Sequence, residues 1–121
     1  MTVRPQMWVG IDVGKLSHNA CAVDGTGKVV WTQKLANEQR AIETVIERAH
    51  KSAEQVQWAI DLTSPIASML ITVLLAANEA VVYVPGRVVN TMTSAFRGEG
   101  KTDAKDARVI AQTARMRTDL A

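Results

Sequence analysis

The sequence predicts an α/β domain in which helices flank a mixed sheet of five strands. Short apolar runs mark the strands, at residues 7–15, 56–62 and 81–84 among others. Segments of helical periodicity separate the later runs, whereas short links join the first three. The chain has 121 residues, 47% of them hydrophobic and 21% charged. This length and composition are typical of one globular domain.

The first three strands are predicted to form an antiparallel meander. The opening run, residues 7–15, is apolar around a single acid, Asp12, and residues 20–23 and 29–33 follow as strands. Between the last two, residues 24–27 read Asp-Gly-Thr-Gly. This sequence predicts a hairpin turn, and we expect its Asp-Gly step to supply the positive φ.

Helices and strands alternate after the meander. Asn37 is the predicted N-cap of an amphipathic helix whose apolar residues share one face. Residues 56–62 form the fourth strand, and Thr63-Ser64-Pro65 caps a second helix to about Ala77. That helix is apolar on nearly every side, which predicts either burial in the core or an oligomer contact. The apolar face of the first helix comprises Ile42, Val45, Ile46 and Ala49.

The C-terminal third completes the order βββαβαβαα. A fifth strand at residues 81–84 ends at Pro85-Gly86, and a third helix is expected with four apolar side chains inward. The last helix is predicted from Thr102 or Asp103 to about Arg117. Three meander strands followed by two strands reached through helices are typical of the ribonuclease-H-like fold. A Rossmann fold would alternate from the start and carry a glycine-rich phosphate turn. The inward side chains of the third helix are Val88, Val89, Met92 and Phe96.

Composition narrows the functional classes. The single cysteine, Cys21, excludes an internal disulfide and fits a cytoplasmic protein, and with two histidines it leaves no zinc-ligand pattern. No signal peptide or membrane span is expected. Residues 1–85 carry a net charge of −1 and residues 86–121 a net charge of +3. The basic part is either a phosphate-binding surface or an ordinary solvated face.

Two acids are expected at one edge of the sheet. Asp12 lies near the end of the first strand and Asp61 near the end of the fourth, and if these strands are parallel neighbours they would lie about 4.8 Å apart. A carboxylate in a buried strand is costly unless it is paired, which makes Asp12 a candidate site residue. The alternative for Asp61 is that it caps the following helix, a role for which Ser64 is better placed.

Two more acids begin the last helix. Asp103 and Asp106 are spaced i, i+3 and lie on or beside the stripe formed by Ala107 and Ile110. Acids in a first turn also complement the helix dipole, and this reading has equal weight. Together, four clustered carboxylates would need cations, and Mg²⁺ or Mn²⁺ suits oxygen ligands. Two such ions support phosphodiester cleavage.

These residues resemble the DEDD-type insertion-sequence transposases, the family of the pilin-gene invertase and the bridge-RNA-guided recombinases. The resemblance rests on Gly-Ile-Asp-Val-Gly-Lys at residues 10–15, on the acid-ended strand at residues 58–65, and above all on residues 97–107. That last segment reads Arg-Gly-Glu-Gly-Lys-Thr-Asp-Ala-Lys-Asp-Ala. The resemblance identifies residues 1–121 as the N-terminal RuvC-like domain of such a protein.

The resemblance implies roles for individual residues and partners. It makes Asp12, Asp61, Asp103 and Asp106 catalytic metal ligands for Mg²⁺ or Mn²⁺. It implies DNA as the substrate, a guide RNA, and a homo-dimer or tetramer. The family's second acid is usually Glu, so Asp61 is one methylene shorter. The family's C-terminal domain with its nucleophilic serine is absent from these residues, and we expect the isolated domain to be inactive alone.

Basic residues near the acids are the candidate nucleic-acid contacts. They are Lys15, Arg97, Lys101, Lys105 and Arg108. Gly100-Lys101-Thr102 imitates the end of a phosphate loop but lacks the required earlier glycine, where Ala95 stands. Trp8, Trp31, Trp58 and Cys21 are expected in the core.

Three other functions remain open at this level. One is a resolvase-like metal-dependent nuclease that acts on branched DNA. Another is a nucleotide-binding domain of the sugar-kinase or actin-like class, which also carries Gly-Ile-Asp-x-Gly. The third is a non-catalytic nucleic-acid-binding or oligomerisation module in which the acids only cap helices.

Overall fold

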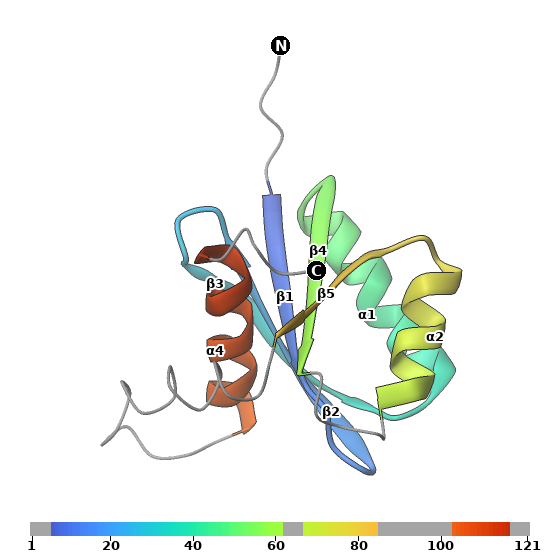
Figure 1. Ribbon diagram of the computed structural model, residues 1–121. Coiled ribbons are helices and arrows are strands. Elements are labelled where there is room, and N and C mark those ends of the chain that lie inside the picture. The colour runs from blue at the N-terminus through green and yellow to red at the C-terminus, as the bar shows by residue number, and fades with distance from the viewer. Residues whose placement is uncertain (1–5, 62–66, 85–102, 117–121) are drawn as a thin grey trace.

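One mixed sheet of five strands forms the centre of the fold, in the order β3-β2-β1-β4-β5 (Figure 1). The computed structural model describes residues 6–61, 67–84 and 103–116, and only the backbone of residues 103–105. The strands are β1 (Gln6–Asp12), β2 (Ser17–Asp24), β3 (Val29–Ala36), β4 (Gln55–Asp61) and β5 (Ala80–Val84). The helices are α1 (Gln39–Ser52), α2 (Ser68–Ala76) and α4 (Asp103–Met116).

Strand pairing confirms the predicted topology. β1, β2 and β3 form an antiparallel meander, whereas β4 lies parallel to β1 and β5 lies parallel to β4. The parallel strands are reached through helices, because a parallel connection needs a crossover. The fold is therefore the expected ribonuclease-H-like α/β arrangement.

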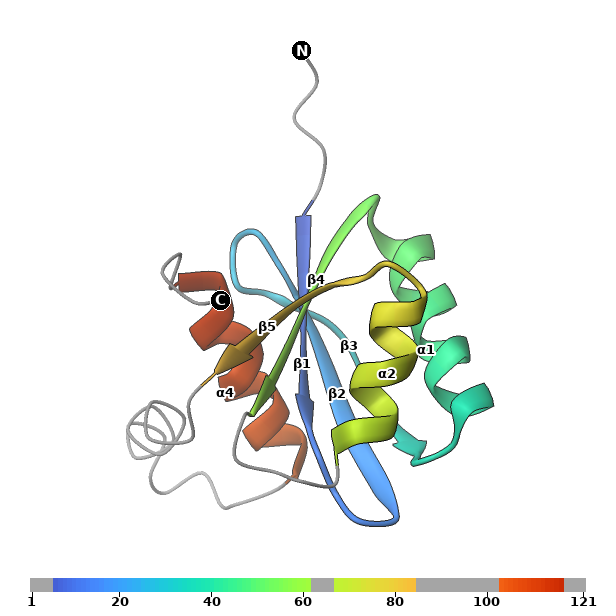
Figure 2. The ribbon, with the colours of Figure 1, turned by 45° about the vertical axis from the view of Figure 1, so that its right-hand side comes forward.

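Helices cover both faces of the sheet. Figure 2 shows α1 and α2 together on one face and α4 alone on the other. Side chains along β1 alternate between these two layers. Met7, Val9 and Ile11 pack in the cluster that includes α1 and α2, whereas Trp8 packs against the residues of α4. All four predicted apolar residues of α1 are buried.

Two local predictions from turn chemistry are wrong. The positive φ of the β2–β3 hairpin belongs to Gly27 (87°) and not to the Asp24-Gly25 step. Asp24 acts instead through its carboxylate, which accepts hydrogen bonds from the amides of Thr26 and Lys28 at 2.9 and 3.0 Å. The helix α1 begins after Glu38, with no side-chain cap, because the side-chain oxygen of Asn37 pairs with His18.

The helix α2 has one buried face rather than being enclosed on all sides. Leu70 and Leu74 are fully buried, whereas Met69 and Leu75 are 43% and 54% exposed. Its sequence is apolar all round, but only the face toward α1 and β5 packs. Of the two alternatives predicted for this helix, complete burial in the core is excluded by these exposed side chains, and the oligomer contact stays a prediction.

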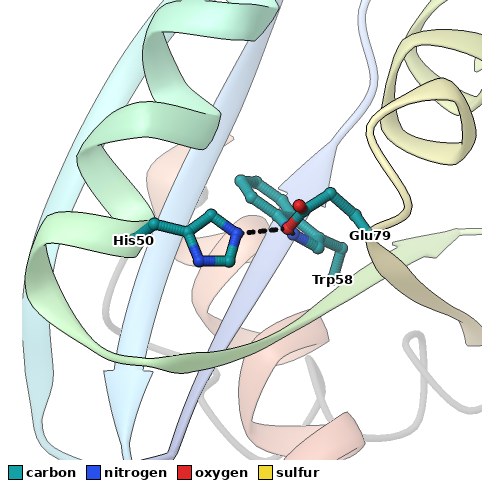
Figure 3. A network of polar contacts seen from close by, with 3 residues as sticks. All are labelled: His50, Trp58 and Glu79. Atoms are coloured by element: carbon teal, nitrogen blue, oxygen red, sulfur yellow. Dashed lines mark hydrogen bonds and ion pairs between the residues drawn. The ribbon is translucent and has the colours of Figure 1, made fainter.

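A polar network fastens the sheet edge where β4 and β5 begin (Figure 3). One carboxylate oxygen of Glu79 accepts hydrogen bonds from the indole of Trp58 and pairs with the imidazole of His50, both at 2.7 Å. The Glu79 side chain is only 8% exposed. The network thereby links α1, β4 and the turn before β5.

Several predictions fall outside the described residues. They concern the Thr63-Ser64-Pro65 cap, the Pro85-Gly86 strand end, the third helix and the loop at residues 97–101. Within the described part, the predicted last helix is confirmed as α4, and Trp31, Trp58 and Cys21 are buried as expected. No described helix has the length and hydropathy to cross a membrane.

Candidate active site

Asp12 and Asp61 end two adjacent parallel strands at the same edge of the sheet. The register pairs Ile11 with Ile60, so the next residue of each strand lies at the same level. Along β4, Trp58 and Ile60 pack with α1 and α2, and Ala59 packs with α4. By alternation, Asp12 and Asp61 therefore belong to the α4 face. Both are half-buried, and both make polar contacts.

The helix α4 runs antiparallel to β1 on this face. Near its C-terminal end, the side chain of Gln112 donates a hydrogen bond of 2.6 Å to the carbonyl of Gly27. Gly27 lies in the hairpin beside the beginning of β1, since Met7 pairs with Asp24. The first turn of α4 therefore lies toward the end of β1, where Asp12 stands. Figure 2 shows α4 starting at the end where β1 and β4 finish.

A glycine sets how closely α4 approaches β1. A Cβ built on Gly10 would overlap the carbonyl oxygen of Ala107 and the amide nitrogen of Ala111. Backbone atoms, not movable side chains, thus occupy the space above Gly10. Ala107 and Ala111 are themselves fully buried. The glycine in the middle of β1 therefore allows the helix to lie directly on the strand.

Asp103 and Asp106 occupy the first turn of α4. Asp106 is half-buried and immediately precedes Ala107, and the side chain of Asp103 is outside the described part. Among the side chains that are described, no three Asp, Glu, His or Cys residues are grouped closely enough to hold a metal ion. The structure brings Asp12 and Asp61 together and turns the start of α4 toward them. The full four-carboxylate site stays a prediction.

The turn after Asp12 is held by a buried histidine. His18 is fully buried, its Nδ1 accepts a hydrogen bond from the amide of Gly14 at 3.1 Å, and its Nε2 lies 3.0 Å from the Asn37 side-chain oxygen. With Nδ1 accepting, Nε2 must carry the proton that it donates to Asn37. Burial lowers the pKa of His18, and the hydrogen bond to Asn37 only partly offsets this effect. The ring is therefore neutral.

Two of the predicted nucleic-acid contacts have described side chains, and both are exposed. Lys15 lies in the turn after β1, and Arg108 lies on α4, one residue beyond Ala107. The side chains of Arg97, Lys101 and Lys105 fall outside the described part. Cys21 is buried between β2 and α4, where it packs with Ala107 and Ala111. Burial raises the pKa of its thiol to about 11, although the charge of Arg108 acts in the opposite direction. Cys21 is thus an inert core residue.

Sequence reasoning missed Gly10 and His18 as parts of this site. A glycine inside an apolar strand is a signal of close backbone approach, and it was available in the sequence. The role of His18 had no such signal, because its partners Gly14 and Asn37 meet only in the folded hairpin. Both residues position the acid-bearing segments without carrying a charge.

Solved structures with the same fold include RuvC of Thermus thermophilus. One was determined in complex with a Holliday junction substrate; it aligns with a TM-score of 0.62 and 13% identity over 89% of this chain and 91% of its own. A second structure of RuvC from the same organism aligns with a TM-score of 0.60 and 14% identity, over 88% of this chain and 92% of its own. At this identity, the likeness establishes the fold.

Sequence relatives come from bacterial insertion elements. The chain is 49% identical over 120 residues to the uncharacterized 44.8 kDa protein of IS116 from Streptomyces clavuligerus, covering 99% of this chain. It is 41% identical over 116 residues, 94% of the chain, to the 42 kDa protein of IS900 from Mycobacterium paratuberculosis. It spans only 30% and 29% of the lengths of these relatives.

A family comparison agrees with these relatives. The IS110 family of DEDD proteins, described as transposases, matches residues 9–121. The matched region contains both strand-end acids and the whole of α4. The chain belongs to the IS110 family of DEDD transposases.

Proposed function

We propose that this chain is the RuvC-like domain, residues 1–121, that supplies the metal-dependent DNA-cleaving site of a transposase. Asp12, Asp61, Asp103 and Asp106 are its catalytic carboxylates. The observation that carries the proposal is the convergence of two strand-end acids at the edge where α4 begins. A helix cap explains one acid at a time, but it does not explain why β1 and β4 end in acids at the same level.

The donor set fits a hard divalent cation. Carboxylate oxygens are the ligands that Mg²⁺ and Mn²⁺ prefer, and neighbouring carboxylates at one edge repel each other unless a cation lies between them. When bound, such ions supply an activated water and stabilise the leaving oxygen of a phosphodiester. The protein's part is to hold the acids: β1 and β4 fix Asp12 and Asp61, and the packing of α4 on Gly10 fixes the helix that bears the other two.

The exposed cations beside the acids favour DNA as the substrate. Lys15 and Arg108 flank the edge from β1 and α4, and we assign them, with Arg97, Lys101 and Lys105, to phosphate contacts. A guide RNA and a homo-dimer or tetramer follow from the family resemblance alone. We also propose that recombination requires a serine-bearing C-terminal domain, so that residues 1–121 alone do not complete the reaction.

Metal binding tests the site directly. Titration calorimetry with Mn²⁺ should give a binding isotherm for the chain, and Asp12→Asn or Asp61→Asn should abolish it. Removing one carboxylate takes away both a ligand and a negative charge. Asp106→Asn should weaken binding measurably, which would place α4 within the site.

The matched control is Glu47→Gln, which removes one exposed carboxylate from α1 on the opposite face of the sheet. It should bind Mn²⁺ like the wild type. Equal Mn²⁺ affinity of Asp12→Asn and the wild type would refute the site. Circular dichroism spectra of all variants establish that the fold is retained.

A further inference from the structure

The tip of the β1–β2 turn carries the most exposed large hydrophobic side chain among the described residues. Leu16 is 83% exposed, whereas the next, Leu75, is 54% exposed. A single exposed leucine is common on protein surfaces and by itself indicates no function. What singles out Leu16 is its position, four residues after Asp12, at the edge of the sheet where the acids converge.

The tip is held in place on both sides of Leu16. Before it, the amide of Gly14 donates to the buried ring of His18 at 3.1 Å. After it, the carbonyl of Leu16 itself accepts a hydrogen bond of 3.0 Å from the amide of Asn37. The turn is also tight, because a Cβ on Gly14 would overlap the carbonyl oxygen of Ser17. The leucine is therefore displayed by a fixed backbone.

The chemistry of the tip fits a nucleic acid. Lys15, next to Leu16, is exposed and offers an ammonium group to phosphate, while the leucine offers an apolar side chain of the kind that enters base steps. Four residues of extended chain reach at most about 14 Å. At about 3.4 Å per base step, this distance corresponds to about four steps. DNA held at the acids thus passes within reach of Leu16.

We propose that Leu16 is a rigid apolar wedge that contacts the bases of bound DNA within about four base steps of the scissile phosphate. This inference rests on the proposed function, since DNA must occupy the acid edge. A fixed backbone matters here, because a wedge on a mobile loop would lose its contact energy to ordering. Lys15 positions the backbone, and Leu16 disturbs the stacking of the neighbouring bases.

The test uses a four-way DNA junction and a linear duplex of the same arm sequence, each with 2-aminopurine at successive positions. Binding is measured by fluorescence anisotropy with Ca²⁺ present, which carboxylate oxygens also bind, and a gel checks that the probes stay intact. Base unstacking is measured by the rise in 2-aminopurine emission. The wild type should raise the emission at one or two positions. Leu16→Ala should remove this rise and weaken binding by about tenfold, equivalent to about 1.4 kcal/mol.

Two further variants complete the design. Leu16→Phe keeps an apolar side chain of wedge size and should keep the emission rise. Leu75→Ala removes an exposed leucine from α2, on the other face of the sheet, and should change neither readout. Because Leu16 makes little contact with the core, Leu16→Ala should melt at the wild-type temperature.

Each contrary result has a distinct meaning. Wild-type affinity and emission in Leu16→Ala would overturn the wedge and leave the proposed metal site standing. Unchanged DNA binding with a lower oligomeric state on size-exclusion chromatography would overturn it in favour of a protein contact. Failure of the wild type to bind either DNA probe would overturn both the wedge and the proposed DNA-cleaving function.

Discussion

The turn between β1 and β2 requires His18 in its neutral form. Its Nδ1 accepts a hydrogen bond from Gly14, and a protonated ring has no lone pair for that purpose. The ring is also fully buried, where a charge would be poorly solvated. The turn that displays Lys15 and Leu16 therefore depends on the protonation state of one imidazole.

Stability should fall as His18 becomes protonated. Its pKa is lowered in the folded state, so below about pH 6.5 the unfolded chain binds a proton that the folded chain resists. The contribution of His18 is complete above that pH and decreases as the pH falls, by at most about 1.4 kcal/mol per pH unit. Urea unfolding at pH 7.5, 6.0 and 5.0 measures it.

The comparison is with His18→Gln, which has no titrating group at this position. The free energy of unfolding of the wild type, less that of the variant, should shrink between pH 6.5 and 5.0. A constant difference over this range would contradict a buried neutral His18. His50, which is exposed on α1, is present in both proteins, so it does not contribute to the difference between their free energies of unfolding.

At the level of residues, the sequence draws attention to charged groups more readily than to neutral ones. Asp12 and Asp61 stand out because an acid in an apolar strand has a free-energy cost that needs a reason. The prediction of Asn37 as a helix cap is wrong because cap preference is local, whereas the partner of its side chain, His18, is 19 residues away. Local rules such as cap preferences fail where a side chain forms its hydrogen bond with a residue that is distant in the sequence.

The helix α4 is far from β1 in the sequence but packs directly on it. Its buried residues Ala107 and Ala111 are small, and they lie on the one position of the strand that has no side chain. The resulting contact is between backbones, so it fixes the separation of strand and helix more tightly than interlocking side chains would. The start of the helix is thereby held at the acid edge.

Adding one methyl group at this contact should displace the helix. Gly10→Ala places a Cβ against the backbone of Ala107 and Ala111, and overpacking of this kind costs about 1–3 kcal/mol of unfolding free energy. Amide hydrogen exchange along α4 should accelerate. If α4 carries metal ligands, Mn²⁺ affinity should fall in the same variant while the circular dichroism spectrum is preserved.

Gly25→Ala is the matched control, because a Cβ on Gly25 meets no atom within 4 Å. It should leave stability, exchange along α4 and Mn²⁺ affinity at wild-type values. Normal exchange along α4 in Gly10→Ala would show that the helix does not rest on this glycine. Faster exchange with unchanged Mn²⁺ affinity would separate the packing role from the metal site.

The existence and order of the elements follow from apolar periodicity, but their contacts do not. The stripe of Ala107, Ile110 and Ala114 predicts which face of α4 is buried, and all three residues are buried. Nothing in that stripe specifies β1 as the partner or Gly10 as the point of approach. The two alternatives predicted for α2 could not be separated from the sequence for a related reason, since apolar composition does not determine how many neighbours a helix has.

At the scale of the whole molecule, the proposed function gives the two edges of the sheet different roles. The acids, the turn at Lys15 and Leu16, and the start of α4 lie where β1 and β4 end. The Glu79 network with Trp58 and His50 closes the opposite edge (Figure 3). DNA binding should therefore depend on charges at one edge of the sheet only.

The salt dependence of DNA binding should locate this surface. Lys15→Ala should reduce the slope of the logarithm of affinity against the logarithm of salt concentration by about 0.9, the value for one lost phosphate contact. Lys51→Ala removes another exposed cation, near the end of α1, and should leave the slope unchanged. Equal slopes for both variants would place the DNA elsewhere.

The position of α4 also determines when the proposed cleaving site can exist. Gly10 and Ala107 meet across almost the full length of the described chain, so every strand of the sheet is synthesised before the helix that rests on it. A nascent or partly unfolded chain can pair β1 with β4 and still lack the first turn of α4. The proposed four-carboxylate site would then be assembled only after the C-terminal helix has folded onto the finished sheet.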